Sequence, residues 1–161
     1  MKFRRHVCSK CLLAEVVHEK MYIQVNNENM LELIYKNENG AAHYDAQRKL
    51  VKTQYKGIVK VEAITDLLRH VIAYAEKNEI RLMCANLTEM QGTFSGAMDF
   101  FENEFYPSMI KNGLRAYAAA LSKDVFTKFA ASQLQKKVGG KLDWQAFSSI
   151  EDAEQWIEKH P

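Results

Sequence analysis

The sequence of 161 residues has little of several features that would each point to a particular class of protein. Its three cysteines are too few for a disulfide framework, which favours a cytoplasmic protein with free thiols. No apolar run approaches the roughly 20 residues that span a bilayer, and the N-terminus makes a poor signal peptide. Lysine and arginine total 22 against 20 aspartate and glutamate, so the basic excess typical of nucleic-acid binders is missing. We therefore expect a cytoplasmic protein without a membrane span and without a nucleic-acid partner.

The short motifs that bind nucleotides or activate a nucleophile are also missing. G-x-x-x-x-G-K-[ST], G-x-G-x-x-G and G-x-S-x-G do not occur, and with seven glycines no loop looks built to cradle a phosphate. Asp66 and His70 lie one helical turn apart, where a carboxylate can orient a general base. No nucleophile accompanies them, so a surface pair is expected instead. The sequence predicts a non-enzymatic protein that holds no cofactor.

One cluster near the N-terminus has metal-ligating side chains. Cys8 and Cys11 are separated by two residues, with His6 before them and His18 further along the chain. Thiolates and imidazoles suit zinc, but a strong zinc pattern needs two such knuckles, and the chain has one. We therefore expect no metal site at Cys8 and Cys11, and we expect Cys84 to be a buried core thiol.

What the sequence does contain is enough apolar material for one packed domain. Apolar residues make up 47% and charged residues 26% of the chain. Turn-forming clusters at 26–29 and 36–40 separate an N-terminal extension, residues 1–40, from a domain of residues 41–161. Within the extension, residues 12–17 have helical spacing and residues 21–25 alternate like a strand. Both interpretations stay open there.

From residue 41 onward the hydrophobic pattern alternates between the periods of strands and helices. In the hairpin expected at 41–57, Val51, Thr53 and Tyr55 lie on one face. In the helix expected at 95–110, Pro107 should kink the helix or end its first segment. Such alternation predicts an α/β fold, with a mixed, mostly parallel sheet of about five strands, about four helices and right-handed crossovers. The expected order is hairpin 41–57, helix 61–78, strand 81–87, loop 88–93, helix 95–110, strand 114–121, a helix ending near 138, strand 142–146 and a helix starting at Ser149.

Three stretches of this pattern resemble a known superfamily. They are Tyr44-Asp45 with LVKTQYKG at 50–57, FYP at 105–107 with GLRAYA at 113–118, and WQAFSSIEDAEQW at 144–156. Residues 41–160 thereby resemble the STAS-like proteins, which have the anti-sigma-factor antagonist fold, and more narrowly the small bacterial members found in bacteroidetes. The resemblance implies the fold and a domain that binds partner proteins, sometimes under the control of phosphorylation. The same architecture is similar to the lipid-carrying half of CRAL-TRIO proteins.

Ser95 is the candidate phosphate acceptor. Classical members carry Asp-Ser or Asp-Thr at the start of the second helix, and the matching residues here are 86–88 and 93–96. Asn86 stands where related proteins tend to have Asp, and the loop is longer than the classical one. At a helix start, Ser95 would favour an attached phosphate. The simpler interpretation, which we favour, is that Ser95 is an N-cap or a first-turn serine.

Phe94, Met98, Phe101 and Phe105 are the candidate ligand or interface residues. The second helix has more aromatic residues and methionines than one buried face needs, so it could bind a second copy of the chain or enclose an apolar pocket. The leading hypothesis is a STAS-like domain that binds a protein partner or forms homo-oligomers. The alternative is a carrier of a small lipid or other apolar ligand. A flat exposed face at these residues would favour the first, and a cavity lined by Phe94, Met98 and Phe101 the second.

Overall fold

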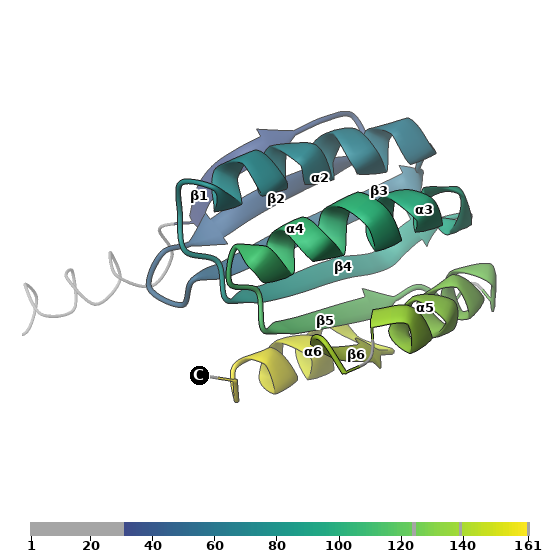
Figure 1. Cartoon of the computed structure of the whole chain (residues 1–161). Helices are drawn as coiled ribbons and strands as arrows, with labels where there is room; N and C mark the ends of the chain where they lie inside the picture. The colour runs from purple at the N-terminus through teal and green to yellow at the C-terminus, as the bar shows by residue number, and fades with distance from the viewer. Residues whose placement is uncertain (1–30, 124, 139, 161) are drawn as a thin grey trace, which may run out of the picture. The chain divides into compact units, whose positions relative to one another are not determined.

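A six-stranded sheet forms the centre of the part of the chain that the structure, a computed structural model, describes (Figure 1). The described residues are 31–160, without residues 124 and 139 and without the side chains of 125–129. The strands follow one another in sequence order, with β1 to β3 antiparallel and β3 to β6 parallel. The expected mixed, mostly parallel α/β sheet is confirmed. The strands are β1 (Leu31–Lys36), β2 (Gly40–Asp45), β3 (Leu50–Ile58), β4 (Leu82–Gln91), β5 (Ala116–Leu121) and β6 (Asp143–Phe147).

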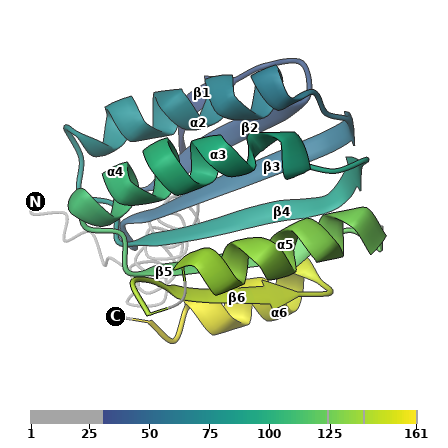
Figure 2. The same cartoon turned by 45° about the vertical axis from the view of Figure 1, so that its right-hand side comes forward.

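The helices cover the two faces of this sheet unequally. Figure 2 shows α2, the α3–α4 segment and α5 on one face and α6 on the other. Each of the first three connects two adjacent parallel strands, and right-handed crossovers between adjacent strands place their helices on the same side. The helical segments are α2 (Val61–Ala75), η1 (Ser95–Ala97), α3 (Met98–Phe100), η2 (Phe101–Phe105), α4 (Tyr106–Lys111), α5 (Val125–Val138) and α6 (Ile150–Ile157).

Two apolar cores follow from this arrangement. The larger lies under α2, α4 and α5 and includes Leu67, Phe105 and Leu134. The smaller lies under α6, where Ala153 and Ile157 pack against residues of β3, β4 and β5. Every second residue of β5 on that side is an alanine, and small side chains allow a helix to approach the sheet closely. The alanines there are Ala116, Ala118 and Ala120.

The sheet has one strand more than the sequence suggested. β1 lies inside the segment 1–40 that the sequence assigns to the extension, and it pairs with β2. A bulge between Leu33 and Tyr35 interrupts the period of two, so that both Ile34 and Tyr35 pack against the larger core. That irregularity hides the strand from pattern analysis. Residues 1–30, with the alternatives left open for them, lie outside the described residues.

The prediction of a loop at 88–93 is wrong for residues 88–91, which belong to β4. β4 continues to Gln91, because its parallel partner β3 also runs on to Ile58 and pairs Lys56 with Glu89 and Gly57 with Met90. Gly57, at φ +69, does not end β3, which extends one residue beyond it. Backbone pairing with a neighbouring strand therefore outweighs the polar composition of this stretch.

The helix expected at 95–110 is broken into segments of different pitch. A 3-10 turn, η1, leads through the short α3 to a π-helical turn, η2, and then to α4. Pro107 lies in the first turn of α4, a position that tolerates proline. Inside one continuous α-helix its ring and its missing N–H would disrupt the preceding turn. The wider π turn before it accommodates the proline and keeps Phe101 and Phe105 buried. The expected interruption at Pro107 is confirmed.

Ser149 caps α6 as the sequence predicts. Its hydroxyl oxygen accepts a hydrogen bond from the Asp152 amide at 3.2 Å, and the hydroxyl lies 2.8 Å from the Asp152 carboxylate, to which it donates. Replacing Ser149 with Ala should lower the free energy of unfolding by about 1 kcal/mol, because one amide of the first turn loses its partner. Urea denaturation measures the change. The exposed neighbour Ser148 provides the control, and equal losses in Ser149→Ala and Ser148→Ala would contradict the role of the cap.

Candidate functional site

A small cavity lies between the sheet and the helices that cover its more crowded face. Its volume is about 20 Å³, which is room for about one water molecule. Four strands contribute to its wall through Tyr55, Leu87, Tyr117 and Trp144. The opposite wall comes from α2, from Phe94 and Phe101, from Tyr106 of α4 and from Leu134 of α5. The cavity is therefore enclosed by segments that are far apart in the sequence.

Hydrogen-bonding groups lie on one side of this cavity. The indole N–H of Trp144 donates to the Tyr106 hydroxyl at 3.0 Å, and that hydroxyl is also hydrogen-bonded to Tyr117. The rings of Tyr117 and Trp144 are nearly parallel, with centroids 6.0 Å apart. Buried polar groups are normally satisfied in this way, and such networks hold their members in fixed positions.

Tyr55 is the exception in this cavity. Its side chain is only 4% exposed, and its buried hydroxyl has no hydrogen-bond partner. Burial raises the pKa of Tyr55 well above its usual value of 10, so the hydroxyl keeps its proton and is available as a donor. An unsatisfied buried polar group costs about 1–3 kcal/mol. Its presence beside a cavity indicates a place for a water molecule or a ligand.

The candidate ligand or interface residues are placed in the core. Phe94 and Phe101 line the cavity, with ring centroids 5.8 Å apart in an edge-to-face arrangement. Phe105 is fully buried behind Phe101 and does not line the cavity, and Met98 is half-buried at the edge of the core. The four residues thus form no flat exposed face. Two of the three residues named for a cavity do line one.

The remaining cavity residues were not identified as a site from the sequence. The sequence places Tyr55 on one face of the hairpin, Tyr117 in the strand expected at 114–121 and Trp144 in the strand expected at 142–146. The available signal was a tyrosine on the buried face of a strand, because its hydroxyl needs a partner inside the core. What the sequence does not reveal is that residues from four strands meet at one place.

Ser95 lies at the surface. It is the first residue of η1, and the Thr93 hydroxyl oxygen accepts a hydrogen bond from the Ser95 amide at 3.1 Å. The hydroxyls of Thr93 and Ser95 are also hydrogen-bonded to each other, at 2.7 Å. The N-cap position of this turn is Phe94, without a side-chain cap, so Ser95 is a first-turn serine and not the N-cap. Whether Ser95 accepts a phosphate stays a prediction.

The pair of Asp66 and His70 lies on the surface of α2, as expected. The His70 ring nitrogen Nδ1 is 3.8 Å from the Asp66 carboxylate and 2.9 Å from the Asp66 carbonyl oxygen. Tyr35 of β1 joins them, since its hydroxyl donates to Asp66 at 2.7 Å and its ring stacks on His70 with centroids 3.7 Å apart. These contacts hold β1 against α2.

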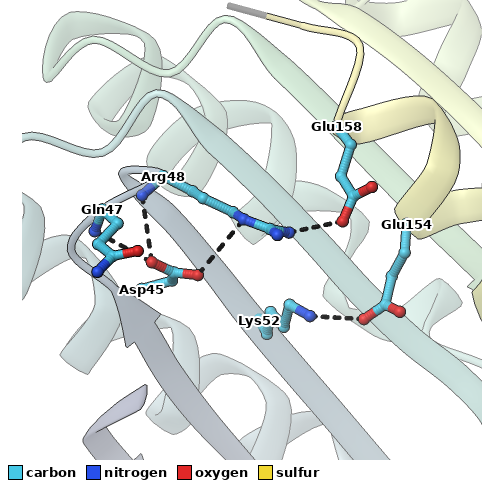
Figure 3. Close-up of polar contacts among 6 residues, drawn as sticks. All are labelled: Asp45, Gln47, Arg48, Lys52, Glu154 and Glu158. Carbon is cyan, nitrogen blue, oxygen red and sulfur yellow. Dashed lines mark hydrogen bonds and ion pairs between the residues drawn. The ribbon is translucent and has the colours of Figure 1, made fainter. Parts of the chain in front are cut away.

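On the opposite face of the sheet, ion pairs connect α6 to the β2–β3 hairpin (Figure 3). Arg48 lies 2.6 Å from Glu158, and Lys52 lies 2.6 Å from Glu154. Asp45 fixes the turn that carries Arg48, since its carboxylate accepts from the amides of residues 47 and 48 at 3.0 and 3.1 Å. Two ion pairs thus connect the β2–β3 hairpin to one side of α6.

In the described part of the chain, α6 packs mainly against β4, β5 and β6 and also reaches Leu50 and Lys52 of β3, which leaves the side toward β1 open. A groove of about 190 Å³ lies there, between Leu31 and His43 on the sheet and Glu154 on α6. Leu33 lies opposite His43 and borders a second, shallow groove of about 560 Å³. Leu31 is 38% and Leu33 54% exposed. We call this surface of β1–β3 the open face.

Cys84 lies at the edge of the open face. Desolvation raises the pKa of its thiol to about 12, so it is a buried, unreactive core thiol, as expected. Among residues 31–160 as described, no group of three His, Cys, Asp or Glu side chains could hold a metal ion. Cys8 and Cys11 lie outside that part.

No protein-family model matches the chain, and no curated protein matches it. No helix within the described ranges is long and apolar enough to cross a membrane.

The buried tyrosines should make the protein sensitive to alkaline pH. Burial raises the pKa values of Tyr55, Tyr106 and Tyr117, whereas in the unfolded chain tyrosine ionises near pH 10. Stability is therefore complete below pH 10 and falls as the pH rises above it, by about 1.4 kcal/mol per pH unit for each such tyrosine.

Urea denaturation of wild type and Tyr55→Phe at several pH values measures this effect. At neutral pH the stability of the variant should differ from that of wild type by no more than about 1 kcal/mol, because no described residue bonds the hydroxyl and a water in the adjoining cavity is the one partner it can lose. Above pH 10 the stability of the variant should fall less steeply. Identical slopes for the two proteins would show that Tyr55 does not stay protonated in the folded state.

Proposed function

We propose that this chain is a non-enzymatic, STAS-like domain that acts by binding another protein on its open face. The observation that carries the proposal is the exposure of Leu31 and Leu33 side by side on a sheet surface that α6 leaves uncovered. The topology, a hairpin followed by three parallel crossovers, supports the resemblance from which the family assignment comes. A bacterial, cytoplasmic regulatory role belongs to the same proposal.

The partner that this surface fits best is a second copy of the chain. Around the two leucines the open face carries charges of both signs, Lys36 and Glu38 at one end and the Lys56–Glu89 pair beside them. In a dimer with two-fold symmetry the same patch meets itself, so a surface that holds both signs can be complementary to its own copy. A patch of one sign would instead repel its copy.

Dilution series in sedimentation velocity experiments test this proposal. Wild type should form dimers, and Leu33→Lys should sediment as a monomer, because a new cation would be placed against an apolar centre and other lysines. Ile58→Lys is the matched control, because Ile58 is 75% exposed and borders neither groove. A wild type that stays monomeric, or a dimer that survives Leu33→Lys, would exclude the open face as a dimer interface.

Control by phosphorylation at Ser95 is a separate part of the proposal. Ser95 is exposed at the surface, where a kinase could reach it. Mass measurement of the protein isolated from its native host should show a phosphorylated fraction under some growth conditions. Fragmentation should place the added mass on Ser95 and not on Thr93, whose hydroxyl lies 2.7 Å away. An unmodified Ser95 under all conditions would contradict this regulation.

The cavity supports a second candidate function, that of a carrier for a small apolar ligand. Phe94 and Phe101, two residues that the sequence singles out, line this cavity together with the unpartnered Tyr55. The cavity lies on the helix-covered side of the sheet and the open face on the other, and neither function excludes the other.

A further inference from the structure

We infer that pH controls association at the open face and that His43 is the group whose protonation separates the two copies. This inference rests on the dimer proposed above. It adds to that proposal a means of regulation and the residue that carries it.

His43 lies at the centre of the open face. On β2 it stands opposite Leu33 of β1 and opposite Lys52 of β3. Its side chain borders both grooves of this surface and is partly exposed. Of the three histidines in the described part of the chain, His70 and His160 lie near a carboxylate, whereas no carboxylate there pairs with His43. A second copy placed on the open face would therefore cover an imidazole without a counter-charge.

The other charges of the open face are already balanced when His43 is neutral. Each cation shares this surface with a carboxylate from the same or a neighbouring element. These pairs are Lys36 with Glu38 along one groove, Asp45 with Arg48 at the β2–β3 turn, Lys52 with Glu154 of α6, and Lys56 with Glu89 of β4. A proton on His43 adds one positive charge that no described carboxylate offsets.

This added charge opposes dimer formation. In a dimer with two-fold symmetry, each His43 would be enclosed between two open faces, and a buried charge without a partner is costly. The neutral imidazole has no such cost, so the dimer binds neutral His43 more tightly than the protonated form. Histidine changes charge at about pH 6.5. By linkage, the dimer therefore has its full strength above that pH and weakens as the pH falls below it.

Dilution series of the full chain in sedimentation velocity experiments, at about pH 8 and about pH 5.5, test the inference. Wild type is compared with His43→Gln, which keeps a neutral polar side chain at both pH values. His70→Gln is the matched control, because His70 lies on α2, which covers the other face of the sheet.

The dimer dissociation constant of wild type and of His70→Gln should rise by up to about a hundredfold at the lower pH, about tenfold for each of the two His43 side chains. That of His43→Gln should stay nearly constant. If wild type dimerises equally well at both pH values, or if His43→Gln keeps the pH dependence, the role of His43 is overturned while the dimer stands. If no protein dimerises at either pH, the proposed dimer fails together with this inference.

A second measurement covers the case in which the glutamine itself weakens the dimer. NMR titration of the His43 ring in wild type, in a concentrated and in a dilute sample, records the pH at which the ring takes up its proton. Proton uptake should occur at a lower pH in the concentrated sample, where the dimer prevails. Uptake at the same pH in a dimeric and a monomeric sample would overturn the inference.

Discussion

The right-handed parallel crossover is the constraint on which the rest of this structure depends. Because β3, β4, β5 and β6 follow one another in order, all three crossovers place their helices on the same face of the sheet. That face is crowded, and the cavity lies where its helices meet the strands. Among the described helices, α6 is the one on the other face, and its eight residues cannot cover six strands. The enclosed cavity and the open face are thus two consequences of one chain path.

Neighbouring buried tyrosines differ in whether another side chain bonds their hydroxyl. Tyr106 and Tyr117 belong to a network with Trp144, and the burial of these hydroxyls is compensated by the hydrogen bonds they make. Tyr55 lies in the same cavity without such compensation, and a phenylalanine there would fill almost the same space. No described residue bonds the Tyr55 hydroxyl, and the adjoining cavity has room for one water molecule that can do so.

The sequence predicts those elements that have strong, uninterrupted periodicity. The hairpin, the helix from Val61, the last two strands and the Ser149 cap all follow from patterns a few residues long. β1 was not predicted, since its bulge breaks the period of two, and the end of β4 was not, since pairing with β3 decides it. For the site, Phe94 and Phe101 stood out by composition alone. Tyr55 did not, because its surroundings become visible only when four strands and four helical segments are brought together.

The sequential order of the strands also bears on how the chain assembles. In many parallel sheets a strand must wait for a distant segment to be inserted beside it, which raises the contact order and slows folding. Here every strand of the described sheet pairs with the one made just before it. The sheet can therefore grow outward from the hairpin during synthesis. Each new strand pairs with a strand that has already left the ribosome.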